Sequence, residues 1–240
     1  MANDPAPNGL QRASLWMLPL AAGLVPALAA GVALALSIRL DLIEFCNPFI
    51  DGCVSISRAA RHDLPNHVFR ALMLPSAVLQ AATWVLCSAW LRGLSAPRRT
   101  GLRALPWLGT LAGVFLILYG TFLGTEGEAY RWLRRYGINL YFGLTYLAML
   151  VAAGTSWQLA RSRLGTSLIA LCALVLALGL LHVLAPLAID DEAFRNRLEN
   201  ILEWHLGLAF TLFFVALAVL WRRTGFAARL DSQSGPTKPG

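Results

Sequence analysis

Hydroxyl and imidazole side chains gather in residues 41–80, the longest polar stretch of an otherwise apolar chain. Ser55 and Ser57 form a Ser-Ile-Ser element there, and His67 follows at the edge of the next apolar run. A histidine within hydrogen-bond reach of a hydroxyl can act as its base, so Ser55 and His67 are candidate catalytic residues. Serines in turns also commonly hydrogen-bond the backbone, and a histidine can simply border a helix. The residue types leave both interpretations open.

Two further histidines, His182 and His205, lie near the ends of the last two apolar runs. His182 is a third candidate catalytic residue, as a base. The two side chains could instead hold one haem or one metal ion between them, because imidazole is a common metal ligand. No His-x-x-x-His or Glu-x-x-His element accompanies them, so the sequence predicts no metal site and no cofactor.

Three polar residues, Arg70, Asn139 and Glu203, each lie close to one end of an apolar run. Ionisable groups at membrane depth usually face the protein interior or water, and they are often functional. Together with Ser57, these residues are predicted to form a polar pocket for a phospholipid headgroup, in which arginine binds the phosphate by charge-assisted hydrogen bonds. Arg70 and Glu203 could equally form a structural ion pair with each other.

Cys46 and Cys53 are separated by six residues, among which Pro48 and the Asp51-Gly52 pair allow a turn. A disulfide can close such a turn, and it would place the segment in an oxidising compartment. The alternative is that the two cysteines bind zinc, but two cysteines alone do not make a four-ligand site. We therefore predict a disulfide.

The composition indicates the elements that must position these residues. Hydrophobic residues make up 57% of the chain and charged residues 14%, with a mean hydropathy of +0.59; a soluble domain carries about 25% charge. Six apolar runs approach the length of about 20 residues that crosses a bilayer as a helix. They are residues 15–38, 67–91, 105–124, 138–160, 166–188 and 201–221. The sequence predicts an all-α integral membrane bundle of six transmembrane helices.

Basic segments without acids predict the orientation of this bundle. Residues 92–103 and 161–165 are of this kind, which is typical of cytoplasmic loops. Both termini are then cytoplasmic, and the long first loop, residues 39–66, lies on the outer side of the cell membrane. Residues 1–14 and 222–240 are predicted to be disordered cytoplasmic segments flanking a transmembrane domain at 15–221.

The net charge of +7 comes from these short loops and does not indicate a nucleic-acid partner. Nineteen arginines against one lysine are typical of a GC-rich genome, and together with the short loops they indicate a bacterial protein of the inner membrane. The predicted partners are membrane phospholipid and a lipid-modifying membrane protein.

Short segments at the end of the first loop and before three apolar runs resemble those of a known family. They are Val54-Ser55-Ile56-Ser57, Pro65-Asn66-His67-Val68-Phe69-Arg70, Arg135-Tyr136-Gly137-Ile138-Asn139, Glu199-Asn200 and Glu203-Trp204. By these segments the chain is similar to the Frag/DRAM/Sfk family of six-helix membrane proteins, which includes the lipid-remodelling factor of GPI anchors. The resemblance implies a link to lipid remodelling, lipid asymmetry or the organisation of lipid-modifying partners.

The sequence is compatible with three functions. The first is a multi-pass membrane protein that interacts with lipid through the outer polar pocket and serves lipid organisation or homeostasis. The second is a lipid-remodelling acyltransferase or hydrolase. The third is a small transporter or a haem or metal protein that uses His182 and His205.

Overall fold

Six long apolar helices account for most of the chain in the computed structural model, which describes residues 11–94, 101–159 and 163–230. All six are long and apolar enough to cross a membrane, as the sequence predicts. The elements in chain order are β1 (Gln11–Ser14), α1 (Met17–Arg39), α2 (Ile56–Ala59), α3 (Asp63–Leu94), α4 (Gly101–Phe122), α5 (Glu128–Leu159), α6 (Arg163–Ala188), α7 (Glu192–Thr224) and β2 (Ala227–Leu230).

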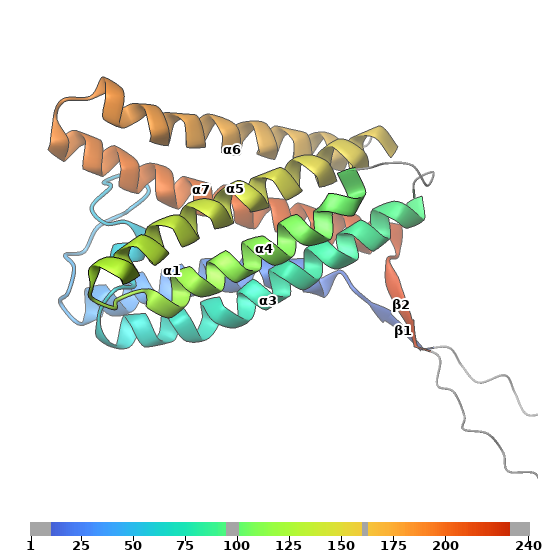
Figure 1. The fold of residues 1–240 in the computed structure, drawn as a ribbon, viewed down its shortest axis with the longest axis horizontal. Helices are drawn as coiled ribbons and strands as arrows, with labels where there is room; N and C mark the ends of the chain where they lie inside the picture. Colours follow the sequence, from blue (N-terminus) through green and yellow to red (C-terminus); the bar gives the residue numbers. More distant parts are fainter. Residues whose placement is uncertain (1–10, 95–100, 160–162, 231–240) are drawn as a thin grey trace, which may run out of the picture.

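The long helices run alternately up and down, so the first loop, the α4–α5 turn and the α6–α7 turn lie at one end of the bundle (Figure 1). We call this the loop end. β1 and β2 lie at the opposite end. α3 packs against α1 and α4, while α7 packs against α1 and α6. α5 packs less closely against α6 than against α4, and α6 lies along one edge of the bundle (Figure 1).

Three helices begin earlier at the loop end than their apolar runs predict. α3 begins at Asp63, α5 at Glu128 and α7 at Glu192, where the sequence predicted starts at 67, 138 and 201. The added turns are polar, so hydropathy does not identify them. Backbone hydrogen bonding nevertheless continues outside the apolar region, and Asp191 caps α7 by accepting hydrogen bonds from two backbone N–H groups of its first turn.

The segments before α1 and after α7 are not wholly disordered, which corrects the prediction for these residues. Gln11–Ser14 pairs antiparallel with Ala227–Leu230, and Gly225 ends α7 in the left-handed conformation that favours glycine. Backbone pairing between the two ends of the chain could not be read from either segment alone. The predictions for residues 1–10, 95–100, 160–162 and 231–240 lie outside the described residues.

Small residues on α4 let this helix approach α3 closely. A Cβ atom on Gly109 would collide with the side chain of Trp84, and one on Gly113 would lie 3.0 Å from the carbonyl oxygen of Ala77. This is the packing expected of a Gly-x-x-x-Gly pair in a membrane. Trp84 itself is fully buried and packs against Phe214 of α7, with ring centroids 5.4 Å apart. Trp84 thereby links the closely packed α3–α4 pair to α7.

Candidate functional site

The first loop is closed by a disulfide between Cys46 and Cys53, as predicted. Between these cysteines, Gly52 has a φ of +62°, and an added Cβ atom there would collide with the carbonyl group of Arg197 on α7. The loop therefore lies directly against the first turns of α7, and only a glycine fits at the point of closest approach.

Side chains of α7 bind the backbone of the same loop. Asn200 donates to the carbonyl oxygen of Gly52 at 2.7 Å, and the indole N–H of Trp204 donates to that of Val54 at 2.9 Å. Both side chains are buried. Because buried backbone carbonyls need donors, these contacts fix the position of the loop on α7.

The short helix α2 continues from this anchored loop toward the bundle. Its N-cap is Ser55, which is 8% exposed and accepts a hydrogen bond from the backbone N–H of Arg58 at 3.2 Å. The hydroxyl oxygens of Ser55 and Ser57 are also 3.2 Å apart. The backbone N–H of Ser57 then donates to the carboxylate of Glu203 on α7 at 3.3 Å. Ser57 and Glu203 are thus brought together by the loop.

A groove of about 810 Å³ lies beside this contact, between α5, α6 and α7. Its lining is polar toward the loop end and apolar elsewhere. The polar and charged residues are Ser57, Arg61, Tyr119, Arg131, Arg134, Arg135, Asn139, Tyr146, His182 and Glu203. The others are Leu123, Ile138, Phe142, Gly143, Val175, Leu176, Gly179, Leu180, Val183, Leu206 and Phe210. The groove occupies the space left by the looser packing of α5 against α6.

Four arginines lie at the polar end of the groove. Arg131, Arg134 and Arg135 share one face of α5 because they are three and four residues apart, and Arg61 lies between α2 and α3. The guanidinium group of Arg134 donates to the carbonyl oxygens of Phe122 (3.0 Å) and Thr125 at the end of α4, so it has a structural role. The side chains of the other three arginines are exposed.

The charges in the helix sequences place this polar end relative to a bilayer. After Glu203, the 18 residues of α7 from Trp204 to Trp221 contain no Asp, Glu, Lys or Arg; they span about 27 Å as a helix. This length approaches the roughly 30 Å hydrocarbon core of a membrane. On α5, Arg135 is likewise the last charged residue before its apolar stretch. When the helices span a bilayer, the charged end of the groove lies at the level of the headgroups.

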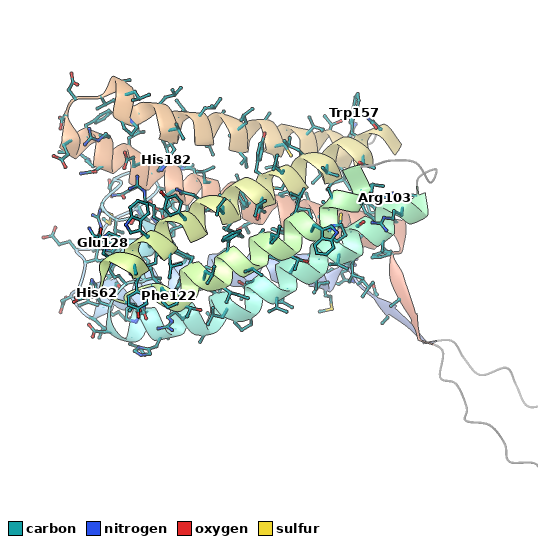
Figure 2. All side chains as sticks on the ribbon, in the orientation of Figure 1. His62, Arg103, Phe122, Glu128, Trp157 and His182 are labelled. Carbon is teal, nitrogen blue, oxygen red and sulfur yellow. A yellow bond between two sulfur atoms is a disulfide. The ribbon has the colours of Figure 1, made fainter. Side chains whose placement is uncertain are left out.

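His182 of α6 completes the polar end of the groove. Figure 2 shows it on α6, toward the loop end. Its Nδ1 atom is buried and has no hydrogen-bond partner among the described residues. An imidazole nitrogen in this state can accept or donate a proton in a hydrogen bond with a bound molecule.

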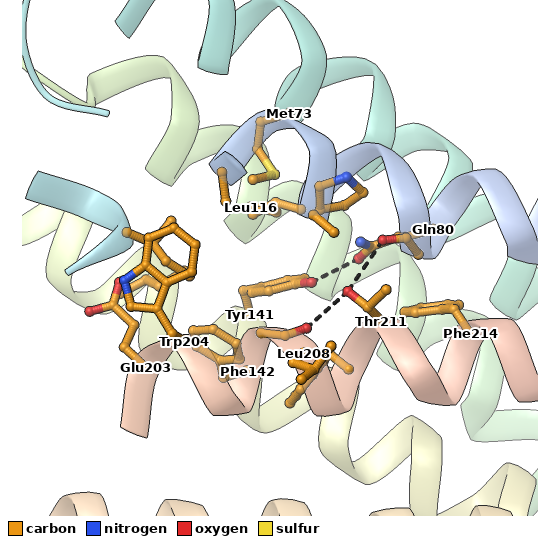
Figure 3. A pocket seen from close by; sticks show the side chains of 18 of the residues that line it. Met73, Gln80, Leu116, Tyr141, Phe142, Glu203, Trp204, Leu208, Thr211 and Phe214 are labelled. Carbon is orange, nitrogen blue, oxygen red and sulfur yellow. Dashed lines mark hydrogen bonds between the residues drawn. The ribbon is translucent and has the colours of Figure 1, made fainter. Parts of the chain in front are cut away.

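A second, smaller cavity of about 150 Å³ lies inside the bundle between α1, α3, α4, α5 and α7. Its polar groups are hydrogen-bonded within the protein: Tyr141 donates to Gln80 at 3.0 Å, Gln80 to the carbonyl oxygen of Ala22 at 3.1 Å, and Thr211 to that of Gly207 at 2.9 Å. Figure 3 shows these groups at one end and Glu203 at the other. Glu203 lines both this cavity and the groove.

The groove contains three of the residues predicted to bind lipid, namely Ser57, Asn139 and Glu203, but not Arg70. Arg70 is half-buried on α3 and lines neither described cavity. The ion pair considered between Arg70 and Glu203 is not formed in the described part of the chain. The buried stripe of α3 includes Phe69 instead, so helix rotation places Arg70 outside the site.

The three candidate catalytic residues do not lie in one cavity. His182 lines the groove, whereas the described cavities include neither Ser55 nor His67 in their lining. Ser55 caps α2, and the Nδ1 atom of exposed His67 lies 2.8 Å from the carbonyl oxygen of Asp63. Both contacts are local side chain to backbone contacts at the start of a helix.

His205 does not line the groove with His182. Its Nδ1 atom lies 2.9 Å from the carbonyl oxygen of Ile201, and its ring packs against Phe49 with centroids 5.4 Å apart. The described residues contain no group of three or more His, Cys, Asp or Glu side chains arranged to hold a metal ion.

Four arginines of the groove, Arg61, Arg131, Arg134 and Arg135, were not among the site residues predicted from the sequence. The sequence predicted that the fourth helix begins at residue 138, so the arginines before that position were assigned to a loop. For the three on α5, the signal that could have found them is the i, i+3, i+4 spacing of Arg131, Arg134 and Arg135, which puts all three on one face once the helix is extended. No such local signal identifies Arg61.

Comparison of the chain with models of known protein families, with curated proteins and with solved structures finds no match. The resemblance to the Frag/DRAM/Sfk family therefore stays a prediction.

Proposed function

We propose that this protein is a multi-pass membrane protein that binds a membrane phospholipid in the groove between α5, α6 and α7. The phosphate lies at the arginine end and the acyl chains extend along the apolar part. One observation carries the proposal: a single groove combines exposed arginines at its loop end with apolar walls along the rest of its length.

Arginine suits this role because its planar guanidinium group binds phosphate oxygens with two parallel hydrogen bonds. Arg131 and Arg135 are exposed on the groove face of α5. Beyond them, Phe142, Val175 and Phe210 offer apolar contacts to a lipid chain. A water-soluble anion would use only the first set of contacts, whereas a phospholipid uses both.

The loop end then faces the outer side of the membrane, where an oxidising compartment allows the Cys46–Cys53 disulfide to persist. We place the protein in a bacterial inner membrane and, from the resemblance, in the Frag/DRAM/Sfk family. Its role is the organisation or homeostasis of lipid, alone or with a lipid-modifying membrane protein.

A second candidate function is lipid remodelling by hydrolysis or acyl transfer. The buried Nδ1 atom of His182, which lacks a partner among the described residues, favours it. In this function His182 acts as a base that takes the proton of an attacking hydroxyl, from water or from a lipid alcohol. The hydroxyl oxygen bonds to the carbonyl carbon of an acyl ester, the ester C–O bond breaks, and the leaving alcohol takes the proton back from His182. Substitution of His182 by Gln would then abolish a change in the acyl chains of bound lipid without reducing the amount bound.

The experiment that tests lipid binding compares phospholipid retained after purification in mild detergent, measured by native mass spectrometry. Substitution of both Arg131 and Arg135 by Gln should lower the retained phospholipid by about tenfold or more, because each charge-assisted hydrogen bond contributes about 1.5–3 kcal/mol.

The matched control replaces Arg39 and Arg195, two arginines of the loop end that line neither described cavity, by Gln. It removes the same charge and should retain lipid like the wild type. Equal retention in all three proteins, or equal loss in both variants, would exclude the groove as the binding site.

A further inference from the structure

The arginine end of the groove also contains one carboxylate. Among the described residues that line the groove, Glu203 is the single acid, beside Arg61, Arg131, Arg134 and Arg135. A site for phosphate alone does not need a negative charge, which repels the phosphate and is costly to place near it. The presence of Glu203 therefore points to a ligand that carries a positive group as well.

The protein leaves the charge of Glu203 available to such a ligand. Its Oε1 atom accepts a hydrogen bond from the backbone N–H of Ser57. Within the described ranges, no arginine, lysine or histidine nitrogen lies within the 4.0 Å of an ion pair with this carboxylate. Arg58 and Arg61 act on this carboxylate only through longer-range electrostatic attraction. Because buried charges are normally paired directly, a bound cationic group would supply a direct partner.

Glu203 also lies at the depth where a headgroup would be found. It is the last acidic residue of α7 before the apolar stretch, as Arg135 is the last basic residue of α5 before its own. Both line the groove. A ligand lying between α5 and α7 at this level meets positive side chains from one helix and a negative side chain from the other.

We propose that the groove selects a phospholipid whose headgroup carries a primary ammonium next to its phosphate, with the phosphate at Arg131 and Arg135 and the ammonium at Glu203. Phosphatidylethanolamine is the simplest lipid of this class. This assignment rests on the proposed function, since it names the lipid class that the groove takes.

A primary ammonium suits Glu203 better than the two other common headgroup types. Its three N–H groups donate charge-assisted hydrogen bonds to a carboxylate. The quaternary ammonium of phosphatidylcholine has no N–H to donate. The glycerol headgroup of phosphatidylglycerol carries no positive charge, so it leaves Glu203 without a counter-charge.

The test offers delipidated protein in detergent an equimolar mixture of phosphatidylethanolamine, phosphatidylglycerol and phosphatidylcholine with identical acyl chains. Native mass spectrometry then reports which lipid is bound. We expect the wild type to prefer phosphatidylethanolamine over phosphatidylglycerol by about tenfold, the effect of one charge-assisted hydrogen bond.

Substitution of Glu203 by Gln keeps an oxygen that can accept from Ser57 and removes the charge, so it should bring this preference close to one. The matched control is Glu199→Gln, one turn earlier on α7 and outside the groove lining, which should keep the wild-type preference. If the Glu203 variant does not fold, the preference of the wild type among the three lipids tests the headgroup assignment by itself.

The outcomes separate this inference from the proposed function. Equal retention of phosphatidylethanolamine and phosphatidylglycerol by the wild type, or the same loss of preference in both glutamate variants, would overturn the assignment to Glu203. If Arg131→Gln with Arg135→Gln still reduced all three lipids, the proposed function would stand. If the wild type retained as much phosphatidylcholine as phosphatidylethanolamine, the proposal that a primary ammonium is recognised would be overturned.

Lipid binding itself fails if the wild type retains none of the three lipids, and the headgroup assignment then fails with it. A soluble analogue tests whether binding requires the acyl chains. Glycerophosphoethanolamine carries the same headgroup without acyl chains. We expect it to leave the bound lipid in place at the same concentration. Full displacement would show that the ligand is the free headgroup and overturn a lipid as the ligand.

Discussion

The backbone N–H of Ser57 and the carboxylate of Glu203 meet at 3.3 Å although 146 positions separate them in the chain. This contact joins the end of the first loop to α7 at the edge of the groove. The indole of Trp204, next to Glu203, binds the carbonyl oxygen of Val54 in the same region. The geometry of the polar end therefore depends on how the loop is held.

The disulfide should contribute measurably to the stability of this loop. Replacement of Cys46 and Cys53 by Ser should lower the free energy of unfolding by about 2–3 kcal/mol, because a closed loop of this length restricts the unfolded chain. Thermal unfolding followed by tryptophan fluorescence measures the change. A reducing agent should lower the midpoint of the wild type and leave that of the variant unchanged. An identical midpoint for the wild type and the variant would contradict the prediction.

The apolar part of the groove can be blocked without touching its arginines. Gly143 on α5 and Gly179 on α6 line the groove, and a Cβ atom on either would meet no atom within 4 Å. Leucine at either position should fill the groove and reduce phospholipid retention, with little effect on the unfolding midpoint. Native mass spectrometry and thermal unfolding report the two quantities.

The control for this experiment is Gly154→Leu. Gly154 also has open space around it and lies on α5, but it does not line the groove. It should retain lipid like the wild type. Unchanged retention in the Gly143 and Gly179 variants would mean that lipid chains lie elsewhere.

Close packing between α3 and α4 should depend on Gly109. Alanine at this position would push its Cβ atom into the side chain of Trp84, which is fully buried. We expect a loss of about 1–3 kcal/mol, the usual cost of overpacking a core. Gly154→Ala, where space is open, should be neutral or stabilising by up to about 1 kcal/mol. Similar midpoints for the two variants would show that the α3–α4 contact can relax.

Substitutions of the neighbouring residues Arg134 and Arg135 on α5 should have different effects on stability and on lipid retention. Arg134→Gln removes the donor to the carbonyl oxygens of Phe122, the last residue of α4, and Thr125, in the α4–α5 turn, so stability should fall by about 1–3 kcal/mol. Arg135→Gln removes an exposed side chain and should change stability by less than about 0.5 kcal/mol while it reduces lipid retention. A purely structural role for both residues would instead lower both midpoints and leave the retention per folded protein unchanged.

The sequence by itself determined the six long apolar helices and the closure of the first loop. Hydropathy is a local property, so each apolar run predicts its own helix, and all six are present. Cys46 and Cys53 are near one another along the chain, so their pairing also follows from local spacing.

Only the tertiary structure decided which polar residues share a site. Arg70 was predicted beside Glu203, but the rotation of α3 places it outside the groove, and Arg131 and Arg135 lie there instead. The rotation of a helix about its axis and the polar turns at its ends depend on packing between segments distant in the chain. Hydropathy along the chain contains no information about this packing. The contact of Ser57 with Glu203 exists because the anchored loop folds back on α7, a relationship that no local pattern in either segment encodes.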